Sequence, residues 1–146
     1  MEIFDADNDG IYELVQWDSA FRYFMDDCGS CSPTPRAVFK YDKTAGVYRP
    51  AKGLQQDFAK ESFEKTAKKL AADFERIKKG DDPGLEVQFY RDMDAHIADT
   101  FYLGEDEKAW QLLNKYYSGP EKKKVRAAFQ ERLDRSKFYR ALKQIN

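Results

Sequence analysis

The chain has 146 residues, of which 42% are hydrophobic and 15% aromatic, a composition that suits a folded globular domain and excludes a disordered chain. Charged residues make up 35% of the sequence but sum to a net charge of only -1, so bulk charge predicts no nucleic-acid binding. No apolar run approaches the ~20 residues that a membrane-spanning helix needs, and we expect no membrane span.

Residues 3–49 have the composition of short strands and turns. Segments rich in β-branched and aromatic residues alternate with segments rich in Gly, Pro, Asp and Ser, which is typical of antiparallel hairpins. Residues 26–35, with two prolines and a glycine, read as a loop. We expect strands over residues 3–4, 11–17, 36–41 and 47–49, with residues 21–25 as a further strand or extended segment.

From about residue 55 onward, apolar residues recur at spacings of three and four, which is typical of amphipathic helices. Helices are expected over residues 55–79, 85–101 and 105–117, and the acidic start of the third suits a helix N-terminus. Pro120 suits the first position of a fourth helix, which we expect to break near Ser136.

These elements predict an α+β fold, with a small antiparallel sheet of three or four strands followed by about four helices. We expect a β-rich lobe over residues 1–52 and a helical lobe over residues 53–146, packed as one compact domain in which helices cover the apolar face of the sheet. An edge strand at residues 47–49 can pair with a second copy, which makes a homodimer one expected assembly.

The first hairpin contains an acidic run, Asp-Ala-Asp-Asn-Asp-Gly-Ile-Tyr-Glu, over residues 5–13. No Lys or Arg precedes Arg22, so the neighbouring sequence offers no cation to offset this charge. Calcium binds about six to eight oxygens, and alternate carboxylates on a tight loop with a glycine supply that geometry. The run therefore predicts a calcium loop, with a bare acidic turn as the alternative.

Two other interpretations of this loop fit less well. An EF-hand needs a bidentate Glu at its twelfth position and helices on both sides, whereas Gln16 occupies that position within an expected strand. The segment from Ile3 to Asp7 is similar to the first motif of haloacid-dehalogenase-type phosphotransferases, but Asp9 stands where that motif has Thr or Val. The chain also lacks the alternation of strands and helices on which that fold depends.

The pattern D-x-D-x-D-G-x-x-E, followed by Leu14 and Val15, resembles the calcium loops of FG-GAP and VCBS repeats, which lie in β-hairpins. The likeness covers about a dozen residues and one copy, whereas propellers contain several. It implies Ca²⁺ as the cofactor, bound by side chains and by one main-chain carbonyl. The implied side-chain ligands are Asp5, Asp7, Asp9 and Glu13, and the implied carbonyl is that of Ile11.

More broadly, the chain resembles a class of uncharacterised exported bacterial proteins that join such a loop to an aromatic segment, a proline-containing loop and a helical tail. The corresponding segments here are residues 5–15, 21–24, 32–35 and 109–113. This resemblance implies no activity. We expect an exported protein, periplasmic or extracellular, because millimolar calcium sites occur mainly outside the cytosol; the chain itself shows no signal peptide.

Two cysteines and one histidine are the other candidates for chemistry. Cys28 and Cys31 form a C-x-x-C pattern within the proline-containing loop, which favours a small disulfide over free thiols, a metal site or a redox pair. His96 lies on the second expected helix near Asp92 and Asp99, where a packing role is expected rather than catalysis.

We therefore expect a non-enzymatic exported domain with a structural calcium site and a structural or interaction role, whose protein partner the sequence does not identify. One alternative is a divalent-metal-dependent hydrolase that uses the acidic run. Another is a helical adaptor that presents Trp110, Tyr116 and Tyr117 together with a basic tail. After residue 118 the chain has nine basic residues against three acidic ones, spread over several helix faces as on a solvated surface.

Overall fold

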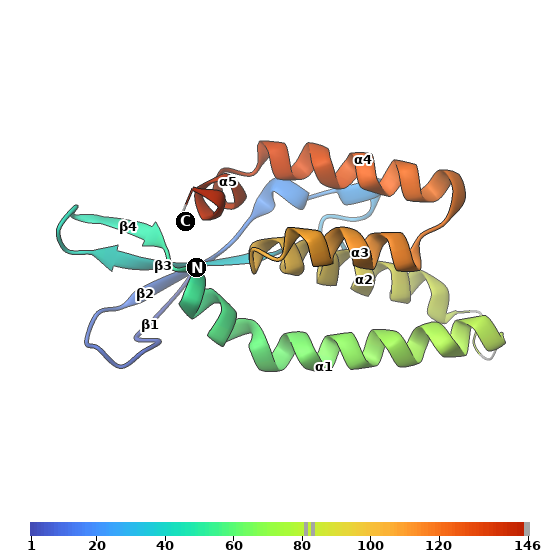
Figure 1. The fold of residues 1–146 in the computed structure, drawn as a ribbon, viewed down its shortest axis with the longest axis horizontal. Coiled ribbons are helices and arrows are strands. Elements are labelled where there is room, and N and C mark those ends of the chain that lie inside the picture. The colour runs from blue at the N-terminus through green and yellow to red at the C-terminus, as the bar shows by residue number, and fades with distance from the viewer. Residues whose placement is uncertain (81, 83, 145–146) are drawn as a thin grey trace.

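The computed structural model describes residues 1–80, 82 and 84–144. Within these residues the fold is α+β, as expected, with an antiparallel sheet at one end of a layer of helices (Figure 1). The strands are β1 (Glu2–Phe4), β2 (Glu13–Trp17), β3 (Arg36–Asp42) and β4 (Val47–Pro50). The helices are α1 (Lys52–Lys79), α2 (Leu85–Tyr102), α3 (Asp106–Tyr116), α4 (Gly119–Arg135) and α5 (Lys137–Lys143), and two 3₁₀ turns are η1 (Ser19–Phe21) and η2 (Phe24–Asp26).

The four strands follow the chain order β1-β2-β3-β4, and each pairs antiparallel with the next. Phe4 lies opposite Glu13 in the first pair, and Val15 lies opposite Val38 in the second. Because side chains alternate between the faces of a sheet, this register places Glu13 and Lys40 on the face that carries Val15 and Val38. The acidic loop and Lys40 are thereby brought to the same end of one face.

Helices cover both faces of this sheet. On the face that carries Phe4, the N-terminal part of α1 packs through Phe58, whose ring centroid lies 5.4 Å from that of Phe4. On the opposite face, α5 packs through Phe138, whose ring lies 5.2 Å from that of Phe39. The strands thus gain the cover that a small sheet needs for stability.

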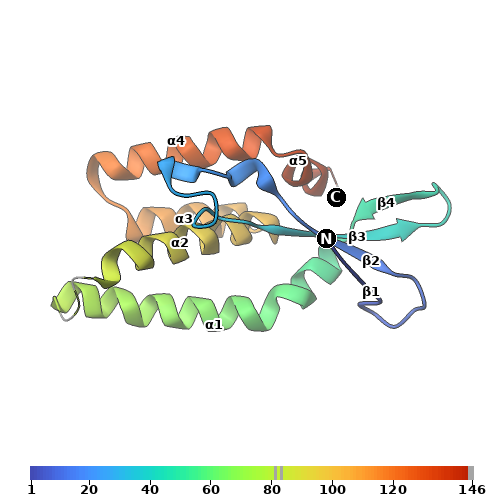
Figure 2. The ribbon, with the colours of Figure 1, turned by 180° about the vertical axis from the view of Figure 1, so that it is seen from behind.

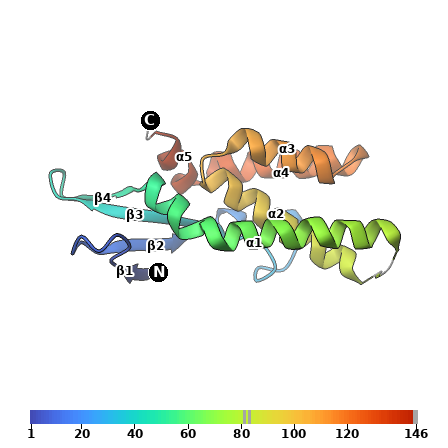
Figure 3. The ribbon, with the colours of Figure 1, turned by 60° about the horizontal axis from the view of Figure 1, so that its bottom comes forward.

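The helices form the larger part of the core, with α2 between α1 and α3 (Figure 3). The predicted apolar stripes face inward: Leu70 of α1, Phe89 and Met93 of α2, and Phe129 of α4 are all buried. The predicted break occurs at Ser136, whose hydroxyl accepts a hydrogen bond from the Tyr139 amide at 2.9 Å and so caps α5. No helix in the described part of the chain has both the length and the apolar character that crossing a bilayer requires.

The expectation of a strand or extended segment at residues 21–25 is wrong, because this segment forms η1 and η2. Phe21 and Phe24 are both buried, whereas Arg22 and Tyr23 between them are exposed. Phe21 ends η1 and Phe24 begins η2, and Tyr23 between them has left-handed backbone with φ of 58°, so the segment does not keep the two-residue alternation of a strand. Both rings pack on Phe129 of α4, at centroid distances of 5.8 and 4.6 Å, so this N-terminal segment belongs to the helical core.

A buried polar network joins the end of β2 to two helices. Asp18, which follows β2, accepts hydrogen bonds from the hydroxyls of Tyr102 on α2 and Ser136 before α5. Its second carboxylate oxygen accepts a bond from the Ala20 amide at 2.8 Å and caps η1. Since both hydroxyls are buried and donate to the same carboxylate, the network fixes the sheet against the helices.

Candidate metal centre

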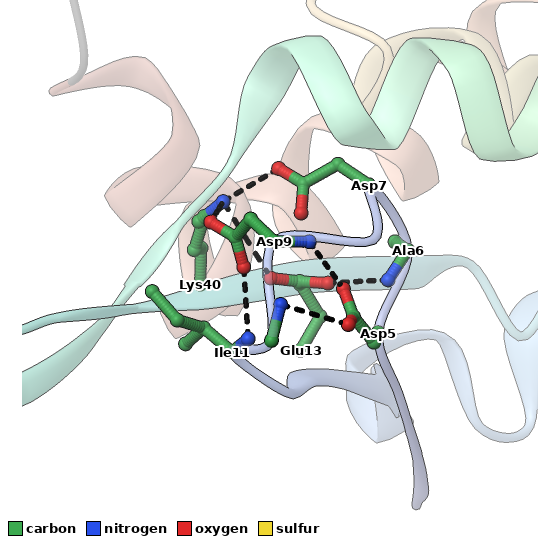
Figure 4. Close-up of polar contacts among 8 residues, drawn as sticks. Asp5, Ala6, Asp7, Asp9, Ile11, Glu13 and Lys40 are labelled. Atoms are coloured by element: carbon green, nitrogen blue, oxygen red, sulfur yellow. Dashed lines mark hydrogen bonds and ion pairs between the residues drawn. The ribbon is translucent and has the colours of Figure 1, made fainter.

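The β1–β2 loop folds its carboxylates inward against its own backbone (Figure 4). Asp5 accepts hydrogen bonds from the amides of Asp9 at 3.0 Å and Gly10 at 2.9 Å. Asp9 in turn accepts a bond from the Ile11 amide at 2.8 Å. The loop reverses through left-handed backbone at Asn8, with φ of 57°, and at Gly10, with φ of 80°, a conformation that Asn and Gly adopt most readily.

Three of the predicted ligands come together in this loop. Carboxylate oxygens of Asp5, Asp7 and Glu13 all lie within 4.8 Å of one another. Asp9 lies beside them, and its carboxylate and that of Asp7 both contact the Lys40 ammonium. Ile11 donates a hydrogen bond from its amide to Asp9, whereas the resemblance implies that Ile11 binds the ion through its carbonyl. The acidic cluster is therefore a feature of the fold, with Asp5, Asp7 and Glu13 at its centre.

Glu13 is the most constrained member of the cluster. Glu13 carries the only carboxylate among the residues of β2, and its side chain is 0% exposed. One oxygen, Oε2, accepts a short hydrogen bond of 2.6 Å from the Ala6 amide. The other, Oε1, is buried and has no hydrogen-bond partner. A buried carboxylate oxygen without a donor is costly, and a cation in the loop would relieve that cost.

Lys40 of β3 is a residue of this site that the sequence did not indicate. Its Nζ lies 2.5 Å from Asp7 Oδ2 and 2.6 Å from Asp9 Oδ2, and 3.9 Å from Glu13 Oε1. The ammonium thus makes close contact with two exposed carboxylates and only a long ion pair with the buried one. No sequence motif identifies this lysine, because it is 31 residues from Asp9 and reaches the loop only through the sheet register.

The charges in the loop perturb one another. The hydrogen bond from Lys40, followed by that from the Ile11 amide, holds the pKa of Asp9 below its ordinary value. The two carboxylates bonded to Lys40 raise the pKa of its ammonium, so it remains protonated at physiological pH. The loop thus holds four acidic side chains against the single ammonium of Lys40, so acidic groups are in excess.

This donor set fits calcium. Calcium prefers hard oxygen ligands in a flexible arrangement, with carboxylates as the charged members. Asp5, Asp7 and Glu13 supply oxygens that already lie close together, and the excess negative charge and the unpartnered Glu13 Oε1 both favour a divalent cation. Lys40 contacts Oδ2 of Asp7, so an ion that took this oxygen would compete with the lysine.

The other predicted residues lie outside this centre. Cys28 and Cys31 form a disulfide within the loop before β3, as expected, so their sulfur atoms are not available to a metal. The ring of His96 stacks on that of Phe63 at 4.2 Å. Burial, with a contribution from Lys108, lowers the pKa of His96 to about 4, so this histidine is neutral at physiological pH and packs as expected.

The aromatic residues of the adaptor hypothesis are part of the core. Tyr116 and Tyr117 are buried. Trp110 contacts Phe101 at a centroid distance of 4.8 Å and is covered by the Arg126 guanidinium at 4.3 Å. In this structure these rings therefore hold the helices together and do not form an open aromatic surface.

Comparisons with known proteins add no family assignment. The chain matches no family model, no curated protein and no solved structure. The resemblance to FG-GAP and VCBS repeats therefore depends on the loop pattern alone. The acidic cluster itself depends on no such comparison, because the fold brings its carboxylates together.

Proposed function

We propose that the chain is a non-enzymatic, calcium-stabilised domain of an exported protein, with a structural or interaction role. One observation carries this proposal: Glu13 Oε1 is buried beside two other carboxylates and accepts no hydrogen bond. A bound calcium ion would satisfy this oxygen and offset the excess charge of the loop. It would hold β1 against β2 and fix the edge of the sheet.

Two further features support the extracellular part of the proposal. The Cys28–Cys31 disulfide is of a kind that persists mainly in oxidising compartments. The loop also resembles calcium loops of exported proteins, where the ion is present at millimolar concentration. Pairing of the edge strand β4 with another copy is a related prediction, since Val47 and Tyr48 are 48% and 41% exposed.

The direct test is a thermal melt in about 2 mM calcium, in excess chelator and in magnesium. For a dissociation constant of about 0.1 mM, which lies at the tight end of the range for extracellular modules, calcium would stabilise the fold by about 1.8 kcal/mol. For a domain of this size the melting temperature should rise by about 5 °C. An equal rise in magnesium would contradict calcium specificity, and no rise in either would refute the ion site.

Ligand variants make the assignment specific. Glu13→Gln and Asp7→Asn should each remove most of the calcium-dependent rise, because each deletes an anionic ligand. The matched control is Asp42→Asn in the β3–β4 turn, where the carboxylate accepts bonds from the Thr44 and Ala45 amides at 2.9 and 3.0 Å. This variant should keep the full calcium response.

The same protein tests the hydrolase alternative. Magnesium- or manganese-dependent turnover of a phosphate ester such as p-nitrophenyl phosphate, abolished by Asp7→Asn, would favour an enzyme and overturn the non-enzymatic assignment. We expect no metal-dependent turnover above that of the Asp7→Asn variant.

A further inference from the structure

A second recessed site lies on the helical side of the molecule, away from the acidic loop. It is a cavity of about 590 Å³, a volume typical of sites for small molecules. Its walls come from η2, from the first half of α2, and from the junction of α3 and α4. Figure 2 shows the segment that contains η1 and η2 lying along α4. Residues of η2 in this segment line the cavity.

The charge of the cavity is strongly unbalanced. Five acidic residues line it, against the two basic residues Arg91 and Lys124. Arg91 is committed to Asp27, with its Nε 2.7 Å from Oδ2 and its Nη2 2.8 Å from Oδ1. Once this pair is set aside, the lining has one basic residue, Lys124, and four acidic residues. The acidic residues are Asp26, Glu86, Asp94 and Glu121.

The titration of groups around the cavity reflects burial first and the neighbouring acidic groups second. Burial raises the pKa of Asp94 to about 7, and the negative charges of Asp27 and Glu121 add to the rise. Burial also raises the pKa of Tyr90, again with contributions from Glu86 and Glu121. The smaller contributions from neighbouring carboxylates are in the direction that a cation in the cavity would oppose.

Aromatic rings line the same space. Phe24, Tyr90 and Tyr117 contribute to the walls, and the rings of Tyr90 and Tyr117 lie 5.1 Å apart. The Tyr117 hydroxyl donates a 2.6 Å hydrogen bond to Asp94 Oδ1, which fixes the ring and the carboxylate relative to each other. Aromatic faces attract organic ammonium ions, and they do so more strongly where water is excluded.

The rim of the cavity has an unusual backbone. Met25 and Asp26, which both line it, have φ of 53° and 61°, and the preceding Tyr23 has φ of 58°. Non-glycine residues rarely adopt this left-handed region, because it brings their side chain close to the backbone. The packing of Phe24 into the core offsets this strain and holds Met25 and Asp26 in the wall of the cavity.

From the volume, charge and aromatic lining together, we infer that this cavity binds a small organic ammonium ion with apolar substituents. The cationic nitrogen lies near Asp94 and Glu121, and the substituents lie against Tyr90, Tyr117 and Phe24. Arg91 does not repel this ligand, because Asp27 neutralises it. The site is independent of the acidic loop and of the calcium proposal.

Choline is a suitable probe, because its neutral isostere 3,3-dimethylbutan-1-ol has the same shape without the charge. We expect choline, titrated into ¹⁵N-labelled protein, to shift amide resonances of residues 24–27, 86–94 and 117–125. The isostere should bind at least about tenfold more weakly, which corresponds to the ~1.4 kcal/mol that a desolvated cation–π and ionic contact can supply. Equal binding of the two compounds, or shifts located elsewhere, would overturn the inference.

Variants identify the groups responsible. Asp94→Asn and Glu121→Gln should each weaken choline binding by about threefold or more. Because Glu121 is exposed, the Glu121→Gln variant should fold normally. The matched control is Asp92→Asn on the same helix, whose carboxylate instead binds Lys69 at 2.8 Å and Gln88 at 2.6 Å. Unchanged choline affinity in both cavity variants, or an equal loss in the control, would contradict the assignment.

Discussion

Replacing Lys40 by methionine tests whether the lysine and calcium compete for the same carboxylates. Lys40 Nζ lies 2.5 Å from Asp7 and 2.6 Å from Asp9, and the three side chains are 30%, 33% and 38% exposed. Ion pairs with this exposure contribute about 0.5 kcal/mol each. In chelator, Lys40→Met should therefore lower the free energy of unfolding by about 1 kcal/mol.

The effect in calcium should be different. If the ion takes the Asp7 carboxylate, the lysine has already lost that contact in the bound state, and its removal there costs only the Asp9 contact. The difference of about 0.5 kcal/mol then appears as a calcium affinity that is about twofold tighter in the variant. A mutation that destabilises the ion-free protein should thus strengthen ion binding.

Urea unfolding followed by circular dichroism, in chelator and in saturating calcium, measures the two free energies, and calorimetric titration measures the affinity. The control is Arg49→Met, which removes an ion pair of 3.0 Å to Asp42 in the other hairpin and should leave calcium affinity unchanged. If Lys40→Met lost the same stability in both conditions, with no gain in affinity, the ammonium and the ion would not compete and the reasoning would fail.

Two further predictions concern buried polar groups. Tyr102→Phe should lower the free energy of unfolding by about 1–2 kcal/mol in urea denaturation, because it removes one of the two hydroxyl donors to the buried Asp18 carboxylate. The exposed Tyr48→Phe should be neutral, and a neutral Tyr102→Phe would show that this hydrogen bond adds no stability. Asp94 has a pKa of about 7 in the fold against an ordinary 3.8, so between these values the native state binds more protons than the unfolded state and stability is lost as pH rises. The stability of the wild type relative to Asp94→Asn should therefore fall by on the order of 3 kcal/mol from pH 4 to pH 8. Urea unfolding of both proteins at each pH measures this difference, in which the opposite contribution of His96 cancels. A difference that does not change with pH would contradict the pKa assigned to Asp94.

The sequence determined the local elements of this protein. The three-and-four spacing of apolar residues is a property of the helix itself, so the stripes of the helices and the break at Ser136 could be predicted without knowledge of their partners. The acidic run and the paired cysteines were equally local, since their members lie within a few residues of one another. For these features the covalent chain already holds the interacting groups close together.

Local patterns were insufficient where two periods compete over a few residues. The segment at residues 21–25 is aromatic enough for a strand, but Phe21 and Phe24 reach the same core three residues apart. Both rings pack on Phe129 of α4, and this long-range contact accompanies the 3₁₀ turns. The ring of α4 lies more than a hundred residues further along the chain, so no short pattern could indicate it.

The tertiary structure alone decided which charges meet. Lys40 reaches the acidic loop because the β2–β3 register places Val38 opposite Val15, and a register shift of one residue would turn the lysine to the other face. The cavity beside Asp94 likewise needs η2, α2 and the α3–α4 junction in one place. Electrostatic interactions depend on distance in space and on burial, and neither quantity is contained in the order of residues along the chain.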